Sequence, residues 1–88
     1  MLYLATYSCG DDDRRNRIGE VVAGLSSNCW KVRDDVWVLE SEDHATTLRD
    51  RIRRHLLDEE RVIVALLAGH AAWHGYDPDS EDWLLAHL

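Results

Sequence analysis

Most of the positive charge in this chain lies on arginines that gather in two short segments. Phosphate groups are bound well by arginine forks held in register on a rigid element, so this clustering is typical of a nucleic-acid contact. We expect the nucleic-acid-binding residues to be Arg14, Arg15, Arg17, Arg49 and Arg53. The alternative is a solvated helix face on which aspartates at helical spacing neutralise part of the charge, Asp50 with Arg54 and Asp11 or Asp13 with Arg15 or Arg17.

Histidine and cysteine offer weaker signals. His70 and His74 are four residues apart, which on a helix presents two imidazoles to one zinc ion. Glycines flank the pair and no third ligand accompanies it, so we expect two loop histidines. His55 lies beside an apolar stripe and is expected to be a partly buried packing residue. Cys9 lies before an expected helix but has no base beside it, so we expect an inert thiol. Cys9 and Cys29 are expected at opposite ends of the sheet, too far apart for a disulfide.

The C-terminal segment, residues 76–88, combines tryptophan with acidic side chains. Asp77 followed by Pro78 is typical of a helix start, and a strand added to a sheet edge is the alternative. The acids would repel phosphate, so the tryptophans are expected to pack this tail on its own body or on a second protomer rather than to stack on bases. Together with the tryptophans on the expected strands, the residues expected to pack a dimer or the tail are Trp30, Trp37, Trp73 and Trp83.

The hydrophobic pattern of the first half predicts strands around one helix. Residues 2–7 form a short apolar and aromatic run that is typical of a strand. Residues 12–25 repeat apolar side chains at helical spacing after three aspartates, which predicts an amphipathic helix. The β-rich runs 29–32 and 36–39 flank a polar turn and indicate a hairpin.

The second half repeats the pattern of a helix followed by a strand. Asp43 is expected to cap a second helix, which places Leu48, Ile52 and Leu56 on one stripe. The apolar run 61–68 has the length and the β-branched residues of a fourth, central-type strand. The terminal segment is then an additional element.

This order of elements predicts an α+β domain of the ferredoxin-like βαββαβ type over residues 1–88. Right-handed crossovers give a four-stranded antiparallel sheet with both helices on one face. The other face would be open, and Tyr3, Tyr7, Trp30 and Trp37 are expected to line it. A second protomer that packs sheet to sheet is the expected cover, so we expect a homodimer.

Length and charge limit the function classes. A chain of 88 residues provides one core, and small cores often gain stability from a second copy. The net charge of −7 excludes a generally basic coat, so a nucleic acid must contact a local patch. No apolar run approaches the roughly 18 residues of a membrane span, so we expect no membrane partner and a cytoplasmic location.

Two stretches of the chain resemble a known family. The run LYLATY at 2–7 and the segment 11–18 resemble the first strand and first helix of the small CRISPR-associated adaptor family, the Cas-two proteins. The segments 72–75 and 82–84 look more like its SinR-like sister group, which is placed with the VapD-type endoribonucleases in the same fold. The resemblance implies a symmetric ferredoxin-like dimer that binds nucleic acid and, in the CRISPR family, bridges copies of the spacer integrase along duplex DNA.

The resemblance also bears on catalysis. Some members of that family are metal-dependent nucleases that need an aspartate at the end of the first strand, where it holds Mg²⁺ with its twin across the dimer axis. The matching residue here is Ser8, whose neutral hydroxyl cannot replace a carboxylate as the anchor of a hard cation. Asp11 and Asp12 are nearby, but acids before a helix are more often caps. We therefore expect no catalytic residue, no cofactor and no metal, with Ser8, Asp11 and Asp12 as weak catalytic candidates.

The resulting prediction is a Cas-two-like dimeric scaffold that binds duplex DNA or RNA without cutting it. One alternative is an endoribonuclease or DNase of the same superfamily, for which Mg²⁺ would be the cofactor. The other alternative is an acidic regulator that binds a protein partner through residues 76–88.

Overall fold

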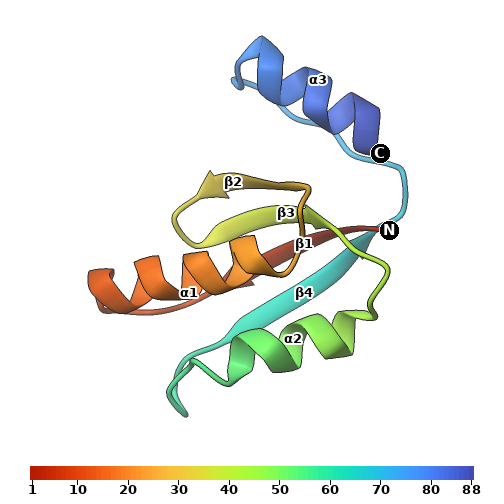
Figure 1. Cartoon of the computed structure of the whole chain (residues 1–88). Coiled ribbons are helices and arrows are strands. Elements are labelled where there is room, and N and C mark those ends of the chain that lie inside the picture. Colours follow the sequence, from red (N-terminus) through yellow and green to blue (C-terminus); the bar gives the residue numbers. More distant parts are fainter.

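The computed structural model describes residues 1–88 as one four-stranded sheet with three helices (Figure 1). The strands are β1 (Leu2–Tyr7), β2 (Cys29–Arg33), β3 (Val36–Glu40) and β4 (Val62–Leu67). The helices are α1 (Asp12–Gly24), α2 (Ala45–Arg53) and α3 (Pro78–His87). Every strand and helix expected from the hydrophobic pattern is present, and the C-terminal segment forms a helix rather than an edge strand.

The sheet has the strand order β2-β3-β1-β4, and each neighbouring pair is antiparallel. β1 lies in the interior, where Ala5 is opposite Trp37 of β3 on one side and opposite Val64 of β4 on the other. β2 and β4 are therefore the two edges. This open α+β arrangement is compatible with the expected ferredoxin-like fold.

α1 and α2 pack on one face of the sheet and bury a common core with it (Figure 1). Side chains alternate along a strand, so that face receives every second residue of β1 and β3. Each helix presents a pair of apolar residues four positions apart to this face. The buried core residues are Tyr3, Ala5, Tyr7, Cys9, Ile18, Val22, Trp37, Leu39, Leu48 and Ile52.

The prediction that Tyr3, Tyr7 and Trp37 line the open face was wrong, because strand alternation places all three beneath the helices. Their polar atoms find partners inside the domain. The Tyr3 hydroxyl donates to the Asp43 carbonyl at 2.7 Å, and the Tyr7 hydroxyl donates to the Asp34 carbonyl at 2.9 Å. Trp37 Nε1 donates to the Tyr7 hydroxyl at 3.2 Å, and burial raises the pKa of that hydroxyl. Trp37 therefore packs in the core and not against a tail or a second protomer.

α3 lies on the opposite face, away from α1 and α2 (Figure 1). It buries Leu84, and the ring of Trp30 contacts both Tyr76, edge-on at 5.2 Å between centroids, and Trp83 at 6.4 Å. The half of this face formed by β4 stays open, with Ile63 63% exposed. The open face is thus partly covered by the chain's own C-terminal helix.

The helix starts depend on short side-chain caps. Asp11 caps α1 and Asp77 caps α3, each by accepting a backbone N–H of the first turn, at 3.1 and 2.8 Å. The hydrogen bonds that Asp77 accepts from Ser80 lower the pKa of the Asp77 carboxyl. The prediction that Asp43 caps α2 was wrong, because the cap position is His44 and its side chain makes no capping bond.

Residues 68–77 connect β4 to α3 without regular structure. Gly69 (φ 80°) and Gly75 (φ 86°) occupy the left-handed region there, which a residue without Cβ adopts at little cost. His70 and His74 lie in this loop, as expected. None of the helices has both the length and the apolar character needed to cross a membrane.

Candidate nucleic-acid interface

Arg14 in the first turn of α1 is held by groups from three other places in the chain. Its guanidinium makes a two-pronged contact with Glu60, at 2.7 Å from Nη1 and 2.5 Å from Nη2. Nη2 also donates to the His55 carbonyl at 3.1 Å, and Nη1 lies 3.3 Å from the Cys9 sulfur. Glu60 in turn accepts the Leu57 N–H at 2.7 Å. This cluster fastens α1 to the segment that leads into β4.

The same cluster shifts the pKa values of both Glu60 and Arg14. The hydrogen bonds from Arg14, followed by the one from the Leu57 N–H, lower the pKa of Glu60 to about 2. The carboxylate correspondingly raises the pKa of Arg14. The Glu60 side chain is 8% exposed and that of Arg14 is 22% exposed, so little of the pair is available to a ligand. Arg14, an expected phosphate ligand, is therefore already occupied.

Arg15 is also used locally. Its Nε and Nη2 donate to the Cys9 carbonyl at 3.2 and 2.8 Å, and its Nη1 pairs with Asp12 at 2.7 Å. The structure thus gives Asp12 an ion pair and Asp11 a capping role, although both were weak catalytic candidates. The pairing of Arg15 involves Asp12 rather than the expected Asp11 or Asp13, and Arg17 takes part in no ion pair.

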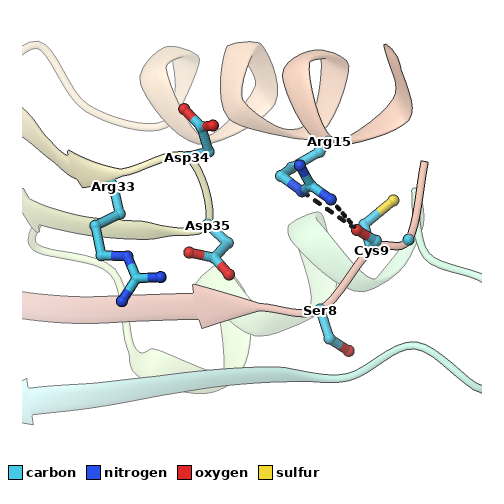
Figure 2. Close-up of a pocket in the computed structure, with 7 residues that line it drawn as sticks. Ser8, Cys9, Arg15, Arg33, Asp34 and Asp35 are labelled. Carbon is cyan, nitrogen blue, oxygen red and sulfur yellow. Dashed lines mark hydrogen bonds between the residues drawn. The ribbon is translucent and has the colours of Figure 1, made fainter. Parts of the chain in front are cut away.

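A hollow of about 680 Å³ lies at the end of β1, and Figure 2 shows its lining. Ser8 points toward β4, where its hydroxyl oxygen accepts the Arg61 N–H at 3.0 Å. Asp34 and Asp35 enter from the turn between β2 and β3, and their carboxylates point apart (Figure 2). No group of three histidine, cysteine, aspartate or glutamate side chains is arranged to hold a metal ion. The residues at this position do not fit the Mg²⁺ site that the family resemblance suggests.

A second hollow of about 680 Å³, which we call the α2–β4 groove, runs between the last turn of α2 and the start of β4. Four apolar side chains and three arginines line it. Its lining residues are Arg49, Arg53, Leu56, Leu57, Asp58, Glu60, Arg61, Val62 and Ile63. Two of the expected phosphate ligands, Arg49 and Arg53, are brought together here.

The charges in the α2–β4 groove are less neutralised than those around Arg14. Arg53 and Arg61 take part in no ion pair, whereas Arg49 donates to Asp50 at 3.0 Å from Nε and 2.9 Å from Nη2. Glu60 is engaged by Arg14, which leaves Asp58 as the lining carboxylate without a cation partner. The groove therefore presents a net positive margin on a chain of net charge −7.

Arg61 was not among the expected ligands. It follows three acidic residues in the sequence and directly precedes β4, so it belongs to neither arginine-rich helix. The signal that could have found it is the short connection between α2 and β4, which brings the residue before β4 to the same hollow as the last turn of α2.

A smaller hollow of about 550 Å³ adjoins α1 and is lined by Arg14, Arg17 and His55 together with Glu20. Arg14 lines this hollow and Glu60 lines the α2–β4 groove, so their ion pair joins a residue of each. The prediction that His55 is a partly buried packing residue was wrong, because its side chain is exposed beyond the end of α2. Arg17 is the remaining expected ligand that is free to meet a phosphate.

The other candidate residues lie away from the groove. Trp30 and Trp83 pack the C-terminal helix on the sheet, and Trp73 is half-buried in the loop before it. The Trp83 ring also stacks on His87 at 4.2 Å between centroids. Cys9 is buried and Cys29 half-buried, and both are free thiols. None of these residues forms part of the positive surface.

No protein-family model matches this chain, and no curated protein matches it.

Proposed function

We propose that this protein is a non-catalytic nucleic-acid-binding module of ferredoxin-like fold, which holds a phosphate backbone along the α2–β4 groove. The observation that carries the proposal is that Arg53 and Arg61, two cations without carboxylate partners, border the same groove. Arg49 on the same margin and Arg17 in the adjoining hollow extend the surface. Arginine forks on rigid elements bind phosphate oxygens in defined geometry.

The order of elements and the resemblance to the Cas-two and SinR-like proteins support the proposal. The sheet order read from the other edge, β4-β1-β3-β2, is the order generated by two βαβ units that interleave in one antiparallel sheet. In this proposal Arg14 and Arg15 do not contact phosphate. They fix the start of α1 by binding Glu60, Asp12 and the Cys9 carbonyl.

The proposed module does not catalyse cleavage, because its residues at the end of β1 do not supply converging carboxylates. Ser8 stands where the family's metal-binding aspartate is expected, and its hydroxyl is engaged by the Arg61 backbone. Asp11 caps a helix and Asp12 pairs with Arg15, so neither is directed to the hollow beside Ser8. Divalent metals in nucleases need converging carboxylates, which these positions do not supply.

The test is fluorescence anisotropy with labelled duplex DNA and single-stranded RNA, in EDTA, across a salt series. The wild type is compared with a protein that carries Arg53→Ala and Arg61→Ala together. Loss of two phosphate contacts should weaken binding and reduce the slope of log K against log salt by about 1.8 for duplex DNA. Absence of binding to either probe at low salt would overturn the proposal.

A matched control separates a local site from a change of net charge. Arg33→Ala with Arg51→Ala removes the same number of charges, but neither residue lines the α2–β4 groove. Arg51 pairs with Asp43 at 3.1 Å, and Arg33 lines the hollow at the end of β1. The control should keep most of the wild-type salt slope. Equal weakening by both double variants would show that net charge alone governs binding, which contradicts a groove site.

A further inference from the structure

The two edges of the sheet differ in how they are protected. β2 carries Lys31 and Arg33, and its register with β3 is broken by an irregularity between these two residues. β4 has the sequence VIVALL, without charge, proline or irregularity. Charges and bulges on an edge strand normally prevent pairing with another chain, and their absence leaves a pairing template. The β4 edge is thus the unprotected one.

Hydrogen bonds at the start of β4 show which backbone groups face outward. Arg61 directs both its N–H and its carbonyl toward β1, since the N–H donates to the Ser8 hydroxyl and the carbonyl accepts the Ser8 N–H. Backbone groups of successive residues alternate in direction along an antiparallel strand. Ile63 and Ala65 therefore face β1. The residues whose N–H and carbonyl face the free edge are Val62, Val64 and Leu66.

We propose that a second copy of this chain pairs along this edge, β4 against β4, antiparallel about a two-fold axis at Val64. In this register Val64 is opposite Val64 of the second copy, and Val62 is opposite Leu66 of the second copy. All the outward N–H and carbonyl groups of Val62, Val64 and Leu66 are then hydrogen-bonded. A register shifted by two residues would leave some of them unpaired.

Side chains support the same register. Opposed residues in an antiparallel pair share a face, so Ile63 meets Ala65 of the second copy on the open face. Ile63 is 63% exposed and Leu66 is 53% exposed in the single chain, and pairing covers both with apolar partners. Only 14 of 88 residues are buried in the single chain, so the small core would gain stability from such a partner.

A second copy fits this edge better than an unrelated peptide, because the strand is complementary to itself. In a symmetric pair each residue from Val62 to Leu66 faces another apolar residue of the same strand. This arrangement differs from the expected dimer, which relied on Tyr3, Tyr7 and Trp37 at the open face. Those side chains lie in the core.

The first test compares two exposed leucines. Leu66→Lys places a charge in the pairing edge, whereas Leu85→Lys places the same charge on α3, where Leu85 is 65% exposed. Sedimentation equilibrium without nucleic acid should give the wild type and Leu85→Lys twice the single-chain mass of 10.2 kDa, and Leu66→Lys the single-chain mass. A monomeric wild type at the highest attainable concentration, or a Leu66→Lys dimer, would overturn the proposal.

The second test reads the register without destabilising the sheet. Ile63 and Ala65 of the second copy form a non-hydrogen-bonded pair with Cα atoms about 4.5 Å apart, within disulfide range. Oxidation of Ile63→Cys protein mixed with Ala65→Cys protein should give a covalent dimer. Each variant alone places its new cysteines two residues out of register, beyond about 7 Å, and should give none. Equal cross-linking in the separate samples, or a dimer that never cross-links in the mixture, would contradict this register.

Neither test contains nucleic acid, so the outcome is independent of the groove proposal. A dimer that binds no nucleic acid would overturn only the groove proposal. A monomer that binds nucleic acid through Arg53 and Arg61 would overturn only the edge pairing.

Discussion

Two groups of arginines in this protein share a residue type and differ in what surrounds them. Arg14 and Arg15 begin α1 and are engaged by carboxylates and backbone carbonyls from within the domain. Arg53 and Arg61 border the α2–β4 groove and take part in no ion pair. The first pair stabilises the position of a helix, and only the second is free to bind an anion. The tertiary structure thus separates arginines that are engaged inside the domain from arginines that take part in no ion pair.

The largest expected effect is on stability, because the first group acts as a clamp. Arg14→Ala leaves the 8% exposed Glu60 without a cation partner and removes the contact with Cys9, so we expect the melting temperature to fall by several degrees. Arg53→Ala should stay within the roughly 0.5 kcal/mol of ordinary surface changes. Calorimetry on both variants measures the contrast.

Arg14→Lys provides the control for charge. A lysine keeps the positive charge but cannot make the two-pronged contact with Glu60, so its melting temperature should lie between those of the wild type and Arg14→Ala. A melting temperature of Arg14→Ala equal to that of Arg53→Ala would show that the clamp is not structural.

The next effect concerns the thiols. Cys9 is 7% exposed and its sulfur lies 3.3 Å from Arg14 Nη1, whereas Cys29 is half-buried. We expect a thiol reagent to label Cys29 before Cys9 in the native protein, because Cys29 is the more exposed thiol. Burial raises the pKa of Cys29, so its labelling should increase up to a higher pH than that of a free thiol. In Arg14→Ala the labelling of Cys9 should accelerate, and mass spectrometry of the labelled peptides distinguishes the two sites. Unchanged labelling of Cys9 would mean that Arg14 does not cover it.

Local patterns in the sequence predicted the strands and helices, but not the division between the arginine groups. The cap at Asp11 and the helical spacing of Ile18 and Val22 depend on residues close in the chain. The contact of Arg14 with Glu60 joins residues 46 positions apart, and no local spacing reveals it.

The tyrosines illustrate the same limit on one strand. Tyr3 and Tyr7 were recognised as strand residues, yet the face they occupy depends on which side of the sheet receives the helices. That choice is made by the packing of α1 and α2. Residue types therefore located the strands and helices. The face of the sheet that each side chain occupies, and the ion pairs between distant residues, required the assembled fold.

Acid unfolding isolates the electrostatic part of the clamp. The pKa of Glu60 is lowered from 4.5 to about 2 in the folded protein, so its stabilising contribution is complete above pH 4.5 and is lost as pH falls toward 2. Glu60→Gln should be less stable than the wild type near pH 6. The difference should shrink as pH falls from 4.5 to 2, which urea unfolding across this range measures.

Asp58→Asn is the matched control, since Asp58 lines the same groove without a cation partner. Its stability relative to the wild type should show no comparable narrowing below pH 4.5. A constant difference between Glu60→Gln and the wild type across the range would contradict the assigned pKa.

The smallest expected effect is a gain in affinity for nucleic acid when a paired arginine is freed from its carboxylate. Asp50 accepts two hydrogen bonds from Arg49 and competes with phosphate for it. Asp50→Asn should free Arg49 and raise affinity for duplex DNA by up to about fivefold, because an exposed ion pair contributes up to about 1 kcal/mol. Asp43→Asn frees Arg51 outside the groove and removes the same negative charge, so it reports the effect of net charge alone. If both variants gain affinity equally in anisotropy titrations, net charge alone explains the gain and Arg49 does not contact the nucleic acid. A larger gain for Asp50→Asn places the phosphate at the margin of the groove, where Arg49 lies beside Arg53.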